Sequence, residues 1–590
     1  MNLQNSFIYV HLWSLNSRQI ILNAHRGFRH LFTPIQKQRT NTIFAGLTLL
    51  ASADIIGLGS MVPVLMLALD HSFLEKSSKL RFVYQQFHFG SEGMFLKTLI
   101  CFILLFFIIK GILSFLLQQY IRKTAADIAQ DLSKRSYDWV FQNRAYDRLN
   151  NDGPGFNEVV FFSPYYFVSG TYIPYLTLVS ELLIVMMLTT FFTWYNPIIF
   201  FLIFGLIGGG FFLVNQVAKS RITSLGKASA QFRDQAMREI NYGNGGFTDI
   251  ISHGAEAHFR EKMLQHFRGF SETGIRAINL QTLPFRINEI IALIGMVLLV
   301  IYAYFYSSDN IGEVRALAAL FAIAVFRLLP AANRVLQSLL HLKLSAYTLE
   351  QLTPMVTQPG SKKNKVNSFK QSVSLKNVSF AYSDKPTIIH HLDLQIKKGE
   401  CIGIRGASGT GKTTLVKLLM GFYTPLEGTI TVDEQIISNE MSTVELFSYL
   451  GQDPYIINGT VADNVVFGSH QSKIIIDKIK QALDLAAFTL PENEGDLLDT
   501  PVGDHGSKLS EGQKHRLALA RAIYHDSEIF ILDEPTSALD DETEAQLLNN
   551  LLYLKNLGKT MLIIAHREKV FDICDVVYTL EEKRLTPYMK

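Results

Sequence analysis

Long apolar segments fill the first three fifths of the chain, to about Leu349, and they restrict that part to a bundle of membrane-spanning helices. A helix needs roughly 20 mostly apolar residues to cross the hydrocarbon core of a bilayer. By this measure we expect six spans, at 42–69, 96–117, 172–192, 197–214, 288–306 and 314–329. The hydrophobic content of 48% in 590 residues agrees with a membrane domain better than with one large soluble core.

The connections between the expected spans alternate in length and charge. Residues 119–171 and 215–287 are long and basic, whereas 193–196 and 307–313 are short. The basic residues of the long connections include Arg122, Lys123, Lys134, Arg135, Lys219, Arg221, Lys227, Arg260 and Lys262. Because positively charged connections remain in the cytosol, we expect them on the cytosolic side of the cell inner (plasma) membrane. A formal net charge of only +3 does not favour nucleic acid as a partner.

Five charged residues interrupt the apolar segments or lie at their edges, namely Asp54, Lys110, Glu181, Glu289 and Arg327. An ionised group inside a bilayer costs several kcal/mol unless it is paired or hydrated. The five residues therefore form either ion pairs between helices or a polar cavity that receives a substrate. The sequence alone leaves both interpretations open.

A stretch rich in Lys and in turn-forming residues, 358–368, separates this apolar part from the rest of the chain. Beyond it, short strand-like and helix-like patterns alternate, which is typical of an α/β domain. We therefore expect a membrane domain at 1–353, a linker at 354–372 and an α/β domain at 373–590.

The run Gly406-Ala-Ser-Gly-Thr-Gly-Lys-Thr-Thr414 fits the phosphate-binding loop GxxxxGK[ST]. An expected strand at 401–404 precedes it, and a helix should begin near Lys412. The glycines let main-chain N–H groups approach the phosphates of ATP, and the helix N-terminus adds a favourable dipole. Lys412 is then expected to neutralise the β- and γ-phosphate oxygens, and Thr413 to bind Mg²⁺.

A second element of the ATP site is the apolar run Ile529-Phe-Ile-Leu-Asp-Glu534. Its apolar residues predict a buried parallel strand. The end of that strand would present Asp533 to the metal ion and Glu534 to the attacking water as general base.

The two elements, together with Leu509-Ser-Glu-Gly-Gln513 and an isolated His566, resemble the ABC transporter superfamily, and the resemblance covers the whole chain. It implies six transmembrane helices of the type IV ABC exporter followed by a P-loop ATPase domain. It also implies that Tyr382 stacks on adenine, that Gln452 is a catalytic residue and a metal ligand, and that His566 senses the γ-phosphate. The implied nucleotide-binding residues are Tyr382, Gly406, Ala407, Ser408, Gly409, Thr410, Gly411, Lys412, Thr413, Thr414, Ser510, Gly512 and Gln513.

The resemblance implies a dimer, because the signature residues Ser510, Gly512 and Gln513 would contact the ATP bound to the partner chain. The partner would be a second copy or a paralogous half-transporter. Two positions depart from the family pattern, Glu511 and the run Gly503-Asp-His-Gly506. Segments 146–151 and 254–259 are the expected coupling helices, which would dock on the ATPase domains.

Within the superfamily, the stretches 54–63, 70–96, 180–182 and 326–330 look similar to PglK-type flippases of lipid-linked oligosaccharides. That similarity implies a short amphipathic helix on the outer surface within 70–96, for which a simple capping segment is the alternative. It also implies cavity arginines that attract a diphosphate, for which Arg286, Arg315 and Arg327 are the candidates. A multidrug, lipid or peptide exporter is an alternative function, and a membrane-anchored regulatory ATPase is an alternative of another class.

Overall fold

The computed structural model describes residues 17–69, 74, 77–143, 156–195, 235–306, 311–357, 364–365, 369–382, 386–437, 441–468, 475–490, 496–537 and 539–588, with isolated positions between 205 and 232. The chain divides into two compact units, Met1–Pro359 and Gly360–Lys590. Each unit is described by itself below.

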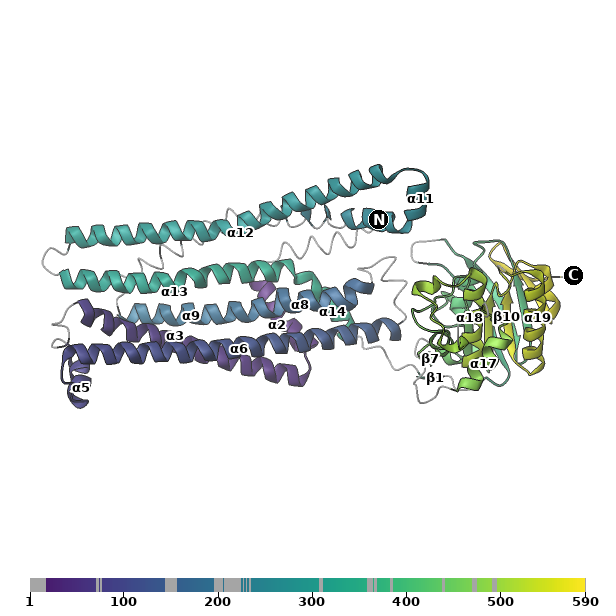
Figure 1. Cartoon of the computed structure of the whole chain (residues 1–590), viewed down its shortest axis with the longest axis horizontal. Helices are drawn as coiled ribbons and strands as arrows, with labels where there is room; N and C mark the ends of the chain where they lie inside the picture. Colours follow the sequence, from purple (N-terminus) through teal and green to yellow (C-terminus); the bar gives the residue numbers. More distant parts are fainter. Residues whose placement is uncertain are drawn as a thin grey trace. The chain divides into compact units, whose positions relative to one another are not determined.

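The first unit is built from long helices and a few short ones. They are α2 (Ser17–Leu31), α3 (Pro34–Leu69), α5 (Ser78–Gln86), α6 (Glu92–Gln142), α9 (Ile173–Tyr195), α11 (Phe247–Ser252), α12 (Glu256–Tyr306), α13 (Ile311–Leu344) and α14 (Ala346–Thr357). A short helix α8 (Ser163–Phe167) lies between two π-helical turns, at Glu158–Phe162 and Val168–Tyr172, and leads into α9. Helix α3 packs on α6 and α9, and α13 packs on α3, α9 and α12, so the long helices run alongside one another (Figure 1).

Three helical stretches in the described part are long and apolar enough to cross a membrane, namely Pro34–Met61, Glu92–Gln142 and Glu158–Thr190. They contain most or all of the expected spans 42–69, 96–117 and 172–192. The expected spans 288–306 and 314–329 lie in helices α12 and α13. The remaining expected span, 197–214, lies almost wholly outside the described residues.

Helix α6 presents apolar side chains outward. Almost all residues in its most apolar stretch are exposed or only partly buried within the chain, with Ile103 as the exception. Phe102 and Ile108, for example, expose 66% and 60% of their surface. A long helix that is apolar on its outer face is stable next to lipid or another apolar surface rather than water, so this exposure supports a membrane location.

Aromatic side chains form the core near the start of the chain. The ring of Phe28 on α2 packs on Phe32, Phe167, Tyr172 and Tyr175. These rings are buried, and the Tyr172 hydroxyl forms a 3.1 Å hydrogen bond with the Thr40 hydroxyl. The cluster fixes α2 against the segment that leads into α9.

Helix α5 lies within the segment expected to be either an amphipathic helix or a cap. The Ser77 side chain accepts a hydrogen bond from the Leu80 N–H and so begins the helix. Leu80 and Tyr84, one turn apart, pack against the buried Leu67–Leu74–Phe95 cluster, whereas Phe82 is exposed. The segment is therefore helical and has one packed face.

The second unit contains two main sheets. The first has six strands in the order β12-β11-β4-β10-β9-β8, and the second has four in the order β3-β2-β5-β6. The strands of the first are β4 (Cys401–Arg405), β8 (Phe447–Leu450), β9 (Ile529–Asp533), β10 (Thr560–Ile564), β11 (Val576–Glu581) and β12 (Arg584–Pro587). The others are β2 (Ser372–Phe380), β3 (Ile389–Lys397), β5 (Glu427–Val432) and β6 (Gln435–Ile436), and β1 (Asn364–Lys365) pairs with β7 (Met441–Ser442).

The six-stranded sheet has a parallel core. Strand β10 pairs in parallel with β4 and β9, and β9 pairs in parallel with β8. All residues of β9 and β10 are buried, as expected for strands covered on both faces. The helices of this unit are α15 (Lys412–Leu419), α16 (Val461–Val466), α17 (Ile476–Leu485), α18 (Glu511–His525) and α19 (Asp541–Asn556). The strands expected at 401–404 and 529–533 are confirmed as β4 and β9.

Two of the three cysteines, far apart in the sequence, are neighbours in this unit. The thiols of Cys401 on β4 and Cys574, just before β11, lie 3.7 Å apart as free cysteines. The Asp575 N–H donates to the Cys401 carbonyl at 2.7 Å, and the Cys401 N–H donates to the Asp575 carboxylate at 2.9 Å. Strand pairing therefore brings them together. Cys101 lies exposed on α6.

Candidate functional site

The phosphate-binding loop connects β4 to α15, which begins at Lys412 as expected. Gly409 and Gly411 have φ angles of 82° and 107°, which favour glycine. A Cβ at Gly406 would lie 2.7 Å from the Leu580 carbonyl oxygen, so a side chain there would displace the neighbouring main chain. These glycines give the loop a shape that exposes its main-chain N–H groups.

Lys412 lies across this loop. Its Nζ donates to the carbonyl oxygens of Gly406 at 2.6 Å and Ala407 at 3.0 Å, and it lies 3.4 Å from His566 Nε2. Burial lowers the pKa of Lys412, and the nearby Asp533 and Glu534 carboxylates oppose that effect. The loop and the end of β9 therefore form one site.

Asp533 ends strand β9 and is 4% exposed. Burial first, and then the neighbouring Glu534, raise the pKa of Asp533 to about 6. A buried carboxylate of this kind is stabilised by a nearby cation, so this position fits a Mg²⁺ ligand. The side chain of Glu534 lies 3.4 Å from His566 Nε2. The structure thus brings Lys412, Asp533, Glu534 and His566 together.

Tyr382 also reaches the start of α15. Its hydroxyl forms a 3.1 Å hydrogen bond with the Thr414 hydroxyl, and its ring packs against Phe380 and Tyr423. Thr413, the expected metal ligand, lies on the first turn of α15 next to these groups. Gln452 follows strand β8 and is exposed. The order β8-β9 places it beside the strand that carries Asp533.

The signature run forms the start of α18. The Ser510 hydroxyl accepts from the Gln513 N–H at 3.3 Å, and the Gln513 side chain accepts from the Ser510 N–H at 2.9 Å. This reciprocal pair is a capping box, which explains why these residue types begin the helix. In the described residues, no hydrogen bond or ion pair joins Ser510, Gly512 or Gln513 to the phosphate-binding loop.

The two departures from the family pattern lie nearby. The exposed Glu511 forms a 2.8 Å ion pair with Lys514 one turn along α18. The run Gly503–Gly506 contains a short 3-10 helix in which His505 has a φ of 49°, and the His505 ring packs on Tyr455. Neither residue contacts the phosphate-binding loop in the part of the chain that the structure describes.

One buried carboxylate beside this site was not expected from the sequence. Glu544 on α19 exposes only 2% of its side chain and forms a 2.9 Å ion pair with Arg567, which follows His566. A second cation, Lys569, lies 3.9 Å away. Glu544 therefore fixes the loop that carries His566. The only sequence signal is an acidic residue in the first turn of a helix, which is common and uninformative.

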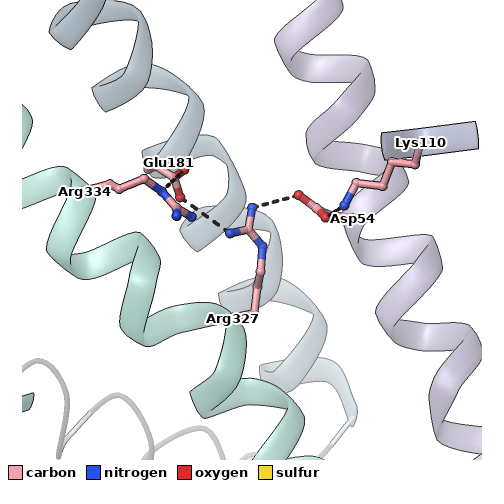
Figure 2. Close-up of polar contacts among 5 residues, drawn as sticks. All are labelled: Asp54, Lys110, Glu181, Arg327 and Arg334. Atoms are coloured by element: carbon pink, nitrogen blue, oxygen red, sulfur yellow. Dashed lines mark hydrogen bonds and ion pairs between the residues drawn. The ribbon is translucent and has the colours of Figure 1, made fainter. Parts of the chain in front are cut away.

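A second candidate site lies among the long helices (Figure 2). Asp54 on α3 pairs with Lys110 on α6 and, at 2.8 Å, with Arg327 on α13. Glu181 on α9 pairs with Arg334 at 2.6 Å and lies 3.9 Å from Arg327. We call these five residues the charge cluster. With three cations and two carboxylates, it has a net charge of +1.

Most of the charge cluster is shielded from solvent. The side chains of Asp54, Glu181 and Arg327 expose 12%, 9% and 18% of their surface, and that of Arg334 exposes 41%. The Arg327 Nε atom is buried without a hydrogen-bond partner. The ion-pair interpretation of Asp54, Lys110, Glu181 and Arg327 is therefore correct for this conformation. Arg334 belongs to the cluster but was missed, because it lies beyond the last expected span.

The other two substrate candidates lie elsewhere. Arg286 on α12 pairs with Glu289 on the same helix at 3.3 Å, and both are exposed. Arg315 lies on α13, and its side chain is outside the described residues.

The second expected coupling segment, 254–259, spans a turn and the start of α12 at Glu256. Gly254 has a φ of 61° at that turn. The preceding residues form the helix α11, in which the Ile250 N–H donates to the Gly246 carbonyl at 2.8 Å. The first expected coupling segment, 146–151, lies outside the described residues.

Comparison with known proteins agrees with this geometry. Residues 389–537, which include the phosphate-binding loop, Gln452, the signature run and Glu534, match the family model described as ABC transporter. The chain is 31% identical over 428 residues to an ATP-dependent lipid A-core flippase of Ralstonia nicotianae, covering 70% of each protein. It is 30% identical over 401 residues to the heterocyst differentiation ATP-binding protein HepA of a Nostoc species, covering 67% of this chain and 64% of that protein.

The fold is also similar to that of a solved exporter. A bacterial Atm1-family ABC exporter with ATP bound matches 94% of this chain and 95% of its own, with a TM-score of 0.70 and 19% sequence identity. Helices of a membrane domain and a P-loop ATPase unit are thus present together. The chain accordingly belongs to the ABC transporters, as an exporter-type half-transporter in which ATP hydrolysis is coupled to transport.

Proposed function

We propose that this protein flips or exports an amphiphile with an anionic head group, and that a lipid-linked oligosaccharide is its substrate. The observation that carries the proposal is the charge cluster, which has a net charge of +1 among apolar helices. An anionic head group would compensate that charge. Relatives named lipid A-core flippases, including those of Ralstonia nicotianae and Cupriavidus metallidurans, support an amphiphilic substrate.

Arg327 is the proposed contact for the substrate head group, with Arg286 and Arg315 as further candidates. Arg327 has a carboxylate on each side, at 2.8 Å from Asp54 and 3.9 Å from Glu181. A phosphate group that enters the cluster would compete with Asp54 for the same guanidinium. Because guanidinium groups bind phosphate through two parallel hydrogen bonds, the exchange is chemically well matched.

In the ATP site, different residues of the chain would bind the phosphates, the adenine and the metal ion, and others would take part in hydrolysis. Main-chain N–H groups of 406–414 would bind the phosphates, Lys412 would neutralise them, and the ring of Tyr382 would stack on adenine. Thr413, Gln452 and Asp533 would hold Mg²⁺, which neutralises charge on the phosphate oxygens. Glu534 would accept a proton from the attacking water, and His566, beside both Lys412 and Glu534, would contact the γ-phosphate.

The functional unit is proposed to be a dimer, either of two copies or with a paralogous half-transporter. Ser510, Gly512 and Gln513 are not bonded to the phosphate-binding loop of their own chain in the described residues, which leaves them available to a partner's ATP. We further propose six spans in a membrane domain at 1–353, a linker at 354–372 and a cytoplasmic ATPase domain at 373–590 in the cell inner membrane.

The test is the ATPase activity of the purified protein in lipid nanodiscs, with and without undecaprenyl-diphosphate-linked saccharide. We expect stimulation by the lipid, loss of stimulation in Arg327→Ala, and no hydrolysis in Glu534→Gln, the blank. Arg276→Ala is the matched control, because Arg276 forms an exposed pair with Glu272 on α12 outside the cluster. Hydrolysis without stimulation would refute the lipid-linked substrate and favour a drug, peptide or other lipid. Stimulation without lipid movement in liposomes would favour a regulatory ATPase.

A further inference from the structure

The thiols of Cys401 and Cys574 form a pair inside the ATPase unit. Their sulfur atoms lie 3.7 Å apart, in van der Waals contact, although 173 residues separate them in the chain. Cys401 is fully buried, whereas Cys574 is only partly buried. A buried cysteine usually serves as a small apolar side chain, but two thiols in sulfur contact can also form a covalent bond.

The main chain already holds the two residues at the separation that a disulfide needs. Strand β11 pairs in parallel with β4, with Val576 opposite Ile402, and the Asp575 N–H donates to the Cys401 carbonyl at 2.7 Å. Two cysteines can be joined without main-chain movement when their Cα atoms lie within about 7 Å and their side chains face each other. Strand pairing supplies the first condition, and the sulfur contact supplies the second.

The packing around Cys574 keeps its side chain against β4. A Cβ at Gly403, which faces the same side of β4 as Cys401, would lie 3.2 Å from the Cys574 sulfur, so the glycine makes room for that sulfur. From α19, the Lys555 Nζ donates to the Ile573 carbonyl at 2.9 Å. The contact with Cys574, and then burial, raise the pKa of the Cys401 thiol and keep it protonated. The partly exposed Cys574 is therefore the sulfur that a small oxidant reaches first.

We infer that Cys401 and Cys574 are a redox modification site, at which a hydroperoxide joins them in a reversible disulfide. The Cys574 sulfur attacks the peroxide, so that an S–O bond forms, the O–O bond breaks, and an alcohol or water leaves with the thiol proton. The Cys401 sulfur then attacks the Cys574 sulfenic acid. In that step the S–S bond forms, the S–O bond breaks, and hydroxide leaves with the Cys401 proton as water. The peroxide is reduced and the two thiols are oxidised, and a dithiol reductant reverses the bond.

The disulfide stabilises the ATPase unit without reaching the ATP site. Cys401 begins β4, whereas the phosphate-binding loop follows the other end of that strand, after Arg405. A cross-link between residues so far apart in the chain removes conformational freedom from the unfolded state, and the effect grows with the length of the closed loop. In the cytosol, where thiols are kept reduced, such a bond forms only under oxidative conditions.

The experiment treats the full-length protein in nanodiscs with hydrogen peroxide and then with dithiothreitol. Peptide mass spectrometry without reduction should find the Cys401 and Cys574 peptides joined, and lighter than the two separate peptides by two hydrogen atoms. The temperature of thermal unfolding should rise by about 5 °C or more and return after reduction, whereas the kcat of ATP hydrolysis should change less than about twofold.

Cys574→Ser should remove both the joined peptides and the rise in unfolding temperature. Cys101→Ser is the matched control, because Cys101 is exposed on α6 in the other unit, and its loss should leave both results unchanged. Sulfenic or sulfinic acid at Cys574 with no link to Cys401 would overturn the inference. A link from Cys574 to Cys101 would overturn it as well, and so would a disulfide that leaves the unfolding temperature unchanged or abolishes hydrolysis.

Discussion

The guanidinium of Arg327 donates to Asp54 at 2.8 Å, although 273 residues separate the two in the chain. The bond joins α13 to α3, and Lys110 on α6 pairs with the same carboxylate. Arg327 is therefore already paired with a carboxylate in this conformation. Any anionic ligand that uses Arg327 must compete with Asp54, so Asp54 should control how readily the ligand enters.

Asp54→Asn should strengthen the response to an anionic amphiphile. The change raises the net charge of the charge cluster from +1 to +2 and frees Arg327 for a phosphate. We expect the concentration of lipid-linked saccharide for half-maximal ATPase stimulation to fall about fivefold, which corresponds to about 1 kcal/mol. Glu272→Gln, in an exposed pair on α12, is the control. A higher half-maximal concentration in Asp54→Asn would mean that Asp54 supports the substrate rather than competing with it.

Glu534→Gln should bind ATP and accumulate a closed dimer. The substitution keeps the shape of the side chain but removes the base, which is typically worth at least about 100-fold in rate. ATPase assays and chemical cross-linking in the presence of ATP and Mg²⁺ measure the two effects. Rapid turnover in this variant would remove Glu534 from the role of general base.

Glu544→Gln should lower ATP hydrolysis without direct contact with the nucleotide. The pair with Arg567 loses its charge, so the loop that carries His566 is held less firmly. An ion pair with one partly exposed partner contributes up to roughly 1 kcal/mol, which predicts a loss of kcat of about fivefold or less. Asp541→Asn is the control, because Asp541 pairs with Lys569 while almost fully exposed. Equal activity of both variants would show that Glu544 does not position the loop.

Asp433→Asn should destabilise the ATPase unit at neutral pH but not in acid. Burial acts to raise the pKa of Asp433, but hydrogen bonds from the N–H groups of Gln371, Lys370 and Ser372 outweigh it and hold that pKa below its ordinary value. A depressed pKa in the folded state contributes stability above the unfolded value, about 3.9, and this stability is lost as pH falls through the folded value.

Thermal unfolding of the full-length protein between pH 8 and pH 3 measures this effect. The difference between wild type and Asp433→Asn should be constant down to about pH 5 and should shrink below about pH 4. A difference that persists unchanged at pH 3 would show that hydrogen-bond geometry, rather than charge, makes Asp433 stabilising.

Local patterns were sufficient to predict much of the ATPase unit. The glycine positions of 406–414 predict a phosphate-binding loop between a strand and a helix, and β4 and α15 lie where expected. The apolar run before Asp533 predicts a buried strand, and β9 lies there. Each of these depends on residues close together in sequence.

Long-range partners could not be predicted in the same way. Two ion pairs, Glu544–Arg567 and Arg327–Asp54, form only because helices and strands pack together in the folded chain. The spacing of these residues in the sequence does not indicate which of them will be neighbours. Arg334 was missed because it lies past the apolar run, while its long side chain reaches back to Glu181.

Helices α6 and α12 each contain 51 residues. At 1.5 Å per residue each is about 76 Å long, more than twice the roughly 30 Å of a hydrocarbon core. Such rods act as lever arms: a tilt of about one degree about one end displaces the other by about 1.3 Å, given that length. A small tilt at one end of α6 or α12 is therefore transmitted to its other end as a displacement of ångström size, provided that the helix stays stiff along its whole length.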